Sequence, residues 1–139
     1  MTTKLNPYIS FRGNAREAME FYHSVFGGEL KVSTFADFGA AQEPAEETQV
    51  MHSVLVTPGD LTLMASDSPH RMAYNPGDNF SVSLSGDDDA ELRGYWAGLV
   101  EGGTITEPLT VAPWGDAFGM VTDRFGVTWL VNITANTAG

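Results

Sequence analysis

The sequence repeats one structural pattern within 139 residues, and this duplication constrains the fold more than any other feature. Residues 5–28 read as a strand, a Gly-Asn break, an amphipathic helix and a Gly-Gly stop, and residues 79–103 repeat that order. Two or three strand-like runs follow each copy. The repeat predicts one pseudo-symmetric domain, residues 1–139, built from modules at about 5–67 and 79–134 with a cleft between them.

Apolar periodicity places the individual elements. In the first copy the alternation over residues 5–11 predicts a strand, and apolar residues at helical spacing up to Phe26 predict a helix. Asn14 is its expected N-cap, with Glu17 completing a capping box. Asp87–Asp89 are expected to open the second helix, where the helix dipole favours anions. Further strands are expected at 30–35, 50–56, 61–66, 80–85, 104–107, 117–122 and 127–133.

The late hairpins of the two copies can be aligned by their turn glycines. This alignment pairs Gly59 with Gly126 and Leu63 with Leu130. Residues 37–48 form an acidic, proline-bearing loop between two strands, and their length suits either a lid or a tolerated insertion.

Composition excludes several classes of partner. Eighteen acidic residues against seven basic ones give a net charge of −11, so nucleic acid and anionic membranes would be repelled. There is no cysteine, and no apolar run approaches the roughly 20 residues of a membrane span. We therefore expect a soluble, cytoplasmic protein that binds neither nucleic acid nor membrane.

Several motifs resemble the vicinal oxygen chelate superfamily, which includes glyoxalase I, bleomycin-resistance proteins and extradiol dioxygenases. The narrower resemblance is to its PhnB-like branch, and it covers nearly the whole chain. The most specific motif is the run from Phe118 to Trp129 around the Asp-Arg-Phe-Gly turn. The other carriers are Pro7–Phe11 with Gly13-Asn14, Ala18, Phe21-Tyr22, Gly28-Glu29, Met51-His52 and Leu63–Asp67.

The resemblance implies an α+β fold of two βαβββ modules. Their strands would form a cup-like, eight-stranded mixed sheet with the helices outside and the ligand inside, as in the glyoxalase/bleomycin resistance/dihydroxybiphenyl dioxygenase fold. It also implies a homodimer that binds a small molecule.

Catalytic members of the superfamily hold a divalent metal through His and Glu side chains on four strands. Carrying those positions over gives Pro7, then Leu63 or Met64, then Ser81, then Leu130. None of these supplies the imidazole or carboxylate that such a metal needs. The histidines, His23, His52 and His70, all lie in the first half. We therefore expect no metal and no other cofactor.

His52 is the candidate catalytic residue, because the charge of a histidine changes near neutral pH. The alternative for His52 is a hydrogen-bonded histidine at the edge of the core. Trp114, between Pro113 and Gly115, suits either a pocket wall or a packing residue.

Strand parity extends the predicted cavity. If Pro7 and Leu130 face the cup, then Ile9, Phe11 and Thr128 face it too. The predicted ligand-binding residues are Ile9, Phe11, His52, Met64, Ser81, Ser83, Trp114, Phe118 and Leu130.

Three functions stay open at this point. The first is a metal-free small-molecule-binding protein. The second is a glyoxalase- or dioxygenase-like enzyme, using His52 or a metal held by unusual ligands. The third is a resistance-type protein that closes the acidic loop 37–48 over a cationic drug. The demethylubiquinone methyltransferase label sometimes given to this branch finds no support, since no G-x-G-x-x-G loop is present.

Overall fold

The computed structural model describes residues 3–135 and falls into two compact units that divide between Pro76 and Gly77. We refer to them as unit one and unit two. The predicted module boundaries lie within these units. The prediction that both modules form a single domain stays a prediction.

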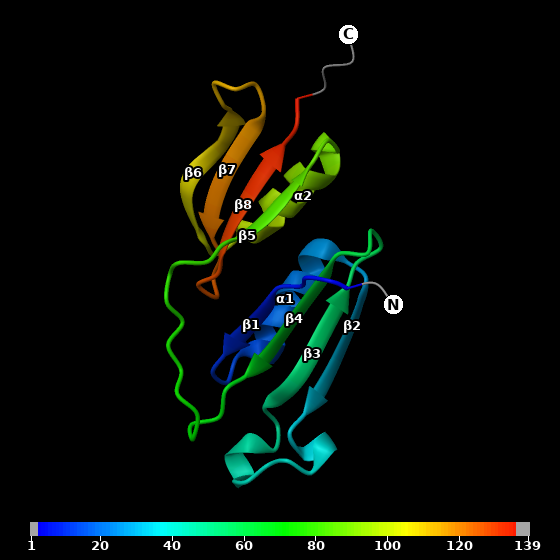
Figure 1. Ribbon diagram of the computed structural model, residues 1–139, viewed down its shortest axis with the longest axis vertical. Helices are drawn as coiled ribbons and strands as arrows, with labels where there is room; N and C mark the ends of the chain where they lie inside the picture. Colours follow the sequence, from blue (N-terminus) through cyan, green and yellow to red (C-terminus); the bar gives the residue numbers. More distant parts are fainter. Residues whose placement is uncertain (1–2, 136–139) are drawn as a thin grey trace. The chain divides into compact units, whose positions relative to one another are not determined.

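Unit one contains one helix and four strands (Figure 1). Its sheet has the order β1-β4-β3-β2, in which β1 runs parallel to β4 and the other neighbours are antiparallel. Two short 3-10 turns, η1 (Ala36–Phe38) and η2 (Pro44–Glu46), occupy the acidic loop. The other elements are β1 (Tyr8–Phe11), α1 (Ala15–Phe26), β2 (Glu29–Thr34), β3 (Val50–Val56) and β4 (Thr62–Asp67).

Unit two repeats this topology. Its sheet has the order β5-β8-β7-β6, again with one parallel pair, β5 and β8. The elements are β5 (Val82–Gly86), α2 (Asp89–Leu99), β6 (Thr104–Val111), β7 (Ala117–Thr122) and β8 (Thr128–Ile133). The predicted α+β class and the pair of βαβββ modules are confirmed, with the strands distributed over two four-stranded sheets.

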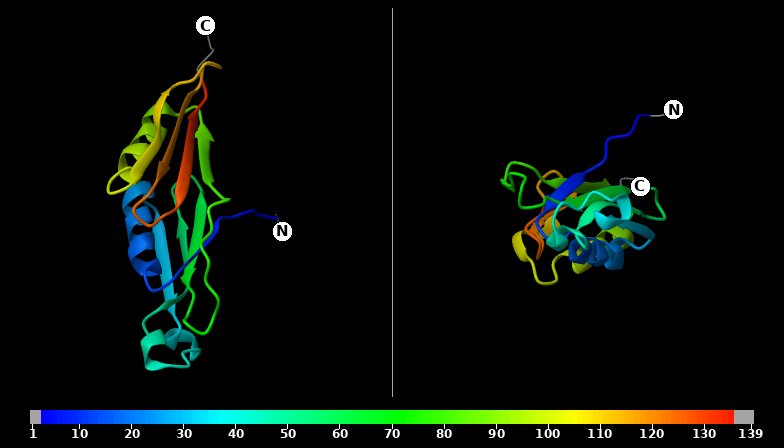
Figure 2. Two further views of the ribbon diagram at one scale, coloured as in Figure 1. Left: turned by 90° about the vertical axis from the view of Figure 1, so that its left-hand side faces the viewer. Right: turned by 90° about the horizontal axis from the view of Figure 1, so that it is seen from below.

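In each unit the helix lies against one face of its own sheet (Figure 2). We call this the covered face, and the opposite side, turned away from the unit's own helix, the open face. Alternation along the strands separates the two: Leu63, Ala65 and Asp67 of β4 are buried, whereas the residues between them are half-buried. In unit two, Trp129, Val131 and Ile133 of β8 are buried on the covered face in the same way.

The start of α1 is capped from a distant strand. One carboxylate oxygen of Asp67 accepts hydrogen bonds from the backbone N–H groups of Gly13 and Ala15, each at 2.9 Å, and its other oxygen accepts from Val50 at 2.9 Å. Asn14 occupies the predicted N-cap position, but its side chain makes no cap bond, so the expected capping box does not form. In α2, Asp88 is the N-cap and accepts from the N–H of Glu91, as the acidic run predicts.

The second glycine of each Gly-Gly pair is required by close packing of the backbone. A Cβ on Gly28 would lie 2.1 Å from the carbonyl oxygen of Val56, and one on Gly103 would lie 2.5 Å from that of Thr122. These contacts bring the chain leaving each helix against the end of the third strand of its unit. The duplication therefore extends to a matching pair of backbone contacts.

Across residues 3–135, none of the helices combines the length and the apolar character that crossing a bilayer would require.

Candidate functional site

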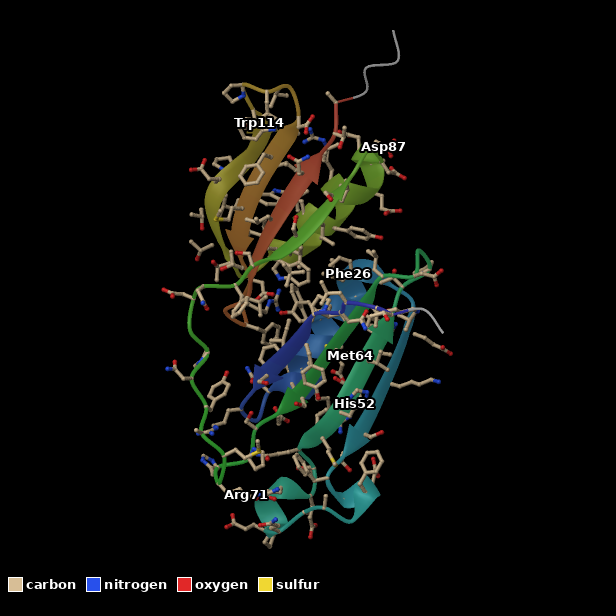
Figure 3. All side chains as sticks on the ribbon, viewed as in Figure 1. Phe26, His52, Met64, Arg71, Asp87 and Trp114 are labelled. Atoms are coloured by element: carbon tan, nitrogen blue, oxygen red, sulfur yellow. The ribbon has the colours of Figure 1, made fainter. Side chains whose placement is uncertain are left out.

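Residues of all four strands contribute to the open face of unit one. Tyr8 of β1 pairs with Met64 of β4, which in turn pairs with Val54 of β3. His52 lies two residues before Val54, opposite Ser33 of β2. Figure 3 shows Met64 and His52 on these adjacent strands. The predicted candidates Met64 and His52 thus lie on one face, together with Tyr8, which the sequence analysis did not single out.

The rings of Tyr8 and His52 lie close together. Their centroids are 6.1 Å apart and their planes differ by 28°. The two rings come this close although β4 lies between β1, which carries Tyr8, and β3, which carries His52. Both side chains are exposed, Tyr8 to 50%. A β-bulge opposite Ser33 and Thr34 turns Val50 to the covered face while His52 stays on the open one. His52 is therefore an exposed residue of the open face, and the alternative of a hydrogen-bonded histidine at the edge of the core is wrong.

The predicted cavity residues of β1 lie on the wrong side of the sheet. Phe11 is buried, only 2% exposed, and Ile9 shares its face, which is the covered one. The error comes from taking Pro7 as the inward-facing residue. Because side chains alternate with a period of two, a shift of one residue exchanges the faces, and Tyr8 and Ser10 are the residues on the open side.

The open face of unit two carries most of the candidates from the second half. Ser83 of β5 pairs with Leu130 of β8, and Asn132 of β8 pairs with Phe118 of β7. Thr128 and Met120 lie on the same face. Ser81 is exposed but directly precedes β5 instead of belonging to it.

The two hairpins correspond with an offset of one residue from the predicted alignment of Gly59 with Gly126. Asp60 donates its N–H to the Thr57 carbonyl, as Gly126 does to that of Asp123, each at 3.0 Å. Asp60 therefore corresponds to Gly126, and Met64 to Leu130. The parallel pairs Tyr8–Met64 and Ser83–Leu130 then occupy equivalent places on the two open faces.

Trp114 is displayed by a short, well-anchored loop between β6 and β7 (Figure 3). Ala112 donates to the Asp116 carbonyl at 2.7 Å, and Gly115 donates to the Ala112 carbonyl at 2.9 Å. The carboxylate of Asp116 accepts from the N–H of Ala135 and from the Asn132 side chain. These two bonds hold the pKa of Asp116 below its usual value. Trp114 itself is 65% exposed, and its ring centroid is 6.2 Å from that of Phe118.

A salt bridge ties together the two long loops of unit one. Arg71, in the loop after β4, donates to the buried carboxylate of Glu46 in η2, which also accepts from the N–H of Gln42. Figure 3 shows Arg71 beside the η2 turn. The bond to Arg71 is the main reason that the pKa of Glu46 is lowered. No sequence pattern predicts this pair, because Glu46 and Arg71 lie in loops outside the periodic segments, 25 positions apart.

The side chains on the open faces do not fit a metal of the superfamily type. The parallel strands β1, β4, β5 and β8 present only phenol, hydroxyl, thioether, aliphatic and amide groups there. Those residues are Tyr8, Ser10, Thr62, Met64, Ser66, Ser83, Ser85, Thr128, Leu130 and Asn132. Within residues 3–135, no three His, Asp or Glu side chains gather in a metal-binding group. On the open faces of these four strands a divalent cation would find neither the carboxylate nor the imidazole ligands it prefers.

Comparison of the sequence and the structure with known proteins identifies the family of this chain. The family described as 3-demethylubiquinone-9 3-methyltransferase matches residues 3–132. The chain is 30% identical to protein YjdN of Escherichia coli K12 over 93% of this chain and 94% of that one. It is 40% identical to protein PA1353 of Pseudomonas aeruginosa, with a TM-score of 0.81 over 97% and 100% of the two chains.

Two further solved structures connect the chain to the PhnB-like branch and to the wider fold. A putative 3-demethylubiquinone-9 3-methyltransferase, PhnB protein, from Bacillus cereus is 26% identical, with a TM-score of 0.71 over 95% and 100% of the chains. A glyoxalase/bleomycin resistance protein/dioxygenase superfamily member from Sphaerobacter thermophilus shares the fold, at 19% identity and a TM-score of 0.59 over 96% and 100%. The chain therefore belongs to the family described as 3-demethylubiquinone-9 3-methyltransferase, is similar to its PhnB member from Bacillus cereus, and has the fold of the glyoxalase/bleomycin resistance protein/dioxygenase superfamily.

Proposed function

We propose that the protein is a cytoplasmic homodimer that binds a small organic molecule on the open faces of its sheets, without a resident divalent metal. The observation that supports this most is the composition of those faces. The equivalent pairs Tyr8–Met64 and Ser83–Leu130 combine ring and aliphatic surface with hydroxyl groups. Such surfaces bury an apolar ligand while a few polar groups fix its orientation.

Two measurements test this proposal. Elemental analysis of the purified full-length protein should find no stoichiometric zinc, nickel, manganese or iron. A thermal-shift screen of diverse metabolites should find ligands that raise the melting temperature, since binding to the native state stabilises it in proportion to ln(1 + [L]/Kd). Leu130→Asp should abolish the shift, whereas the same change at exposed Leu61, outside the open-face pairs, should not. Stoichiometric metal, or shifts unaffected by Leu130→Asp, would refute the proposal.

A second candidate function is metal-independent acid–base catalysis by His52. The observation that favours it is the exposed imidazole beside the Tyr8 phenol on one open face. A general base has to lie within hydrogen-bond reach of the proton it removes, and an exposed imidazole meets that condition for a ligand resting on the sheet. Once a ligand is found, His52→Gln should remove turnover while leaving the thermal shift in place; unchanged turnover would exclude this role.

Closure of the acidic loop 37–48 over a cationic drug has less support. Two of the loop's four carboxylates are already used within the unit: Glu46 holds Arg71, and Asp37 accepts from the N–H of Thr34. The methyl transfer in the family's description is not part of our proposal, because the sequence contains no G-x-G-x-x-G loop for a nucleotide cofactor.

A further inference from the structure

We propose that the open face of unit two, together with the β6–β7 loop, binds the head group of an organic cation such as a methylated ammonium. The head group would rest against Trp114 and Phe118 beside the carboxylate of Asp116. This inference rests on the proposed function and names the class of ligand for one of its two faces.

The β6–β7 loop holds Trp114 in an exposed position. An indole that is 65% exposed leaves apolar ring surface in water, which a loop of free conformation would tend to fold away. Here the loop is held by two backbone hydrogen bonds of its own and by Asp116, which bonds to the chain at and beyond β8. A rigid scaffold that keeps an aromatic ring exposed is typical of a binding loop.

Hydrogen bonding and strand pairing place the Asp116 carboxylate near the two rings. The Trp114 and Phe118 centroids are 6.2 Å apart with planes inclined at 58°, so the rings are not stacked flat against each other. Phe118 pairs directly with Asn132, and Asn132 donates to Asp116 at 3.1 Å. One carboxylate is thus placed a single hydrogen bond from the residue opposite Phe118. Ring faces attract cations through the ring quadrupole, and a nearby carboxylate adds charge attraction.

The charge of unit two also favours a cationic ligand. Residues 77–139 contain nine aspartates and glutamates against two arginines, and no lysine or histidine. Arg93 is paired with Asp89, and Arg124 donates to the Glu101 carbonyl. Asp116 adds a carboxylate whose pKa is lowered by its hydrogen bonds to Ala135 and Asn132. Glu107 of β6 pairs with Met120 of the open face and adds a second carboxylate. A surface of one sign attracts ligands of the other sign and repels its own.

The test compares two probes of nearly equal shape, choline and the neutral 3,3-dimethylbutan-1-ol. Binding to the full-length protein is followed by NMR through the indole N–H signal of Trp114, assigned with Trp114→Phe. We expect choline to shift this signal saturably, and the alcohol to bind at least about tenfold more weakly, because it lacks the cation–π and carboxylate attractions. Raised ionic strength should weaken choline and leave the alcohol unchanged.

Variants locate the site. Choline binding to the variants is measured by isothermal titration calorimetry, because the Trp114 variants lack the indole signal. Trp114→Ala and Asp116→Asn should each weaken choline binding by about tenfold, whereas Trp114→Phe, which keeps a ring face, should retain most of the affinity. Phe38→Ala removes an apolar side chain of similar exposure in unit one and is the matched control. Equal affinity for both probes would overturn the cation inference and leave small-molecule binding intact. A Trp114→Ala effect on self-association alone, seen by analytical ultracentrifugation without any choline binding, would overturn it in favour of a protein interface.

Discussion

Asp60 adopts the left-handed backbone conformation at the hairpin-turn position that Gly126 occupies in the second unit. The φ angles are 64° for Asp60 and 87° for Gly126, and each N–H bonds to the carbonyl three residues earlier. Among residues 3–135, Asp60 is the one non-glycine residue with positive φ. Aspartate and asparagine tolerate this region better than other side chains, so the turn geometry is kept although the residue type differs.

The pair predicts how substitutions of Gly126 are ranked. A Cβ at Gly126 would meet no atom within 4 Å, so any cost comes from the backbone. We expect Gly126→Ala to lower the free energy of unfolding by about 1 kcal/mol, and Gly126→Asn by about half as much. Urea denaturation measures both. Gly59→Ala, which lies in open space without a positive φ, is the control and should be nearly neutral.

Much of the fold could be predicted because its signals are local. Apolar periodicity places both helices, and the predicted glycine stop follows α1 directly, whereas α2 ends at Leu99, before the predicted stop at Gly102-Gly103. The bounds of β3 and β7 agree with the predicted 50–56 and 117–122. The duplication then determines the topology. The predicted alignment of the two hairpins was displaced by one residue because it paired Gly59 with Gly126. The feature that the two turns share is a positive φ angle, which Asp60 adopts in the first hairpin and Gly126 in the second.

The candidate site was harder to predict because its errors depend on non-local contacts. Parity assigned Ile9 and Phe11 to the wrong face from one misplaced anchor, Pro7. The cap of α1 comes from Asp67, 52 residues from Ala15, so no capping pattern near Asn14 could reveal it. Other predicted ligand-binding residues were assigned to the correct face. Those on the open faces are Met64, Ser83, Phe118 and Leu130.

Gly28 should tolerate no side chain. An alanine Cβ would lie 2.1 Å from the Val56 carbonyl oxygen, and φ is already +90°. We expect Gly28→Ala to destabilise the protein by about 3 kcal/mol, combining a steric clash with backbone strain. Gly13→Ala is the matched control, since its φ is +88° and its Cβ would meet nothing within 4 Å. Equal losses in urea denaturation would show that the close approach contributes nothing.

Asp67 should be irreplaceable even by its own amide. Its two oxygens accept three backbone N–H groups, and an asparagine would present an NH₂ group to at least one of those donors. Because the side chain is buried, at 4% exposure, we expect Asp67→Asn to cost about 2–3 kcal/mol of unfolding free energy. Exposed Asp37, which accepts the Thr34 N–H, is the control, and Asp37→Asn should cost under about 0.5 kcal/mol. Similar losses for the two variants would contradict the capping role.

The Glu46–Arg71 salt bridge should make stability depend on pH. The pKa of the Glu46 carboxyl group in the folded protein is lowered from the usual 4.5, chiefly by the hydrogen bond from Arg71. A carboxyl group whose pKa is lower in the folded state contributes its full stability above the unfolded pKa, and loses it as the pH falls through the folded one. Wild type should therefore melt at a higher temperature than Glu46→Gln at pH 7, with the difference shrinking below about pH 4.5 and vanishing at lower pH.

Arg71→Gln should reduce this pH dependence in the same way, and adding Glu46→Gln to it should change little further, because the two residues act as one pair. A melting-temperature difference that stays constant from pH 7 to pH 3 would show that the bridge does not hold the two loops together.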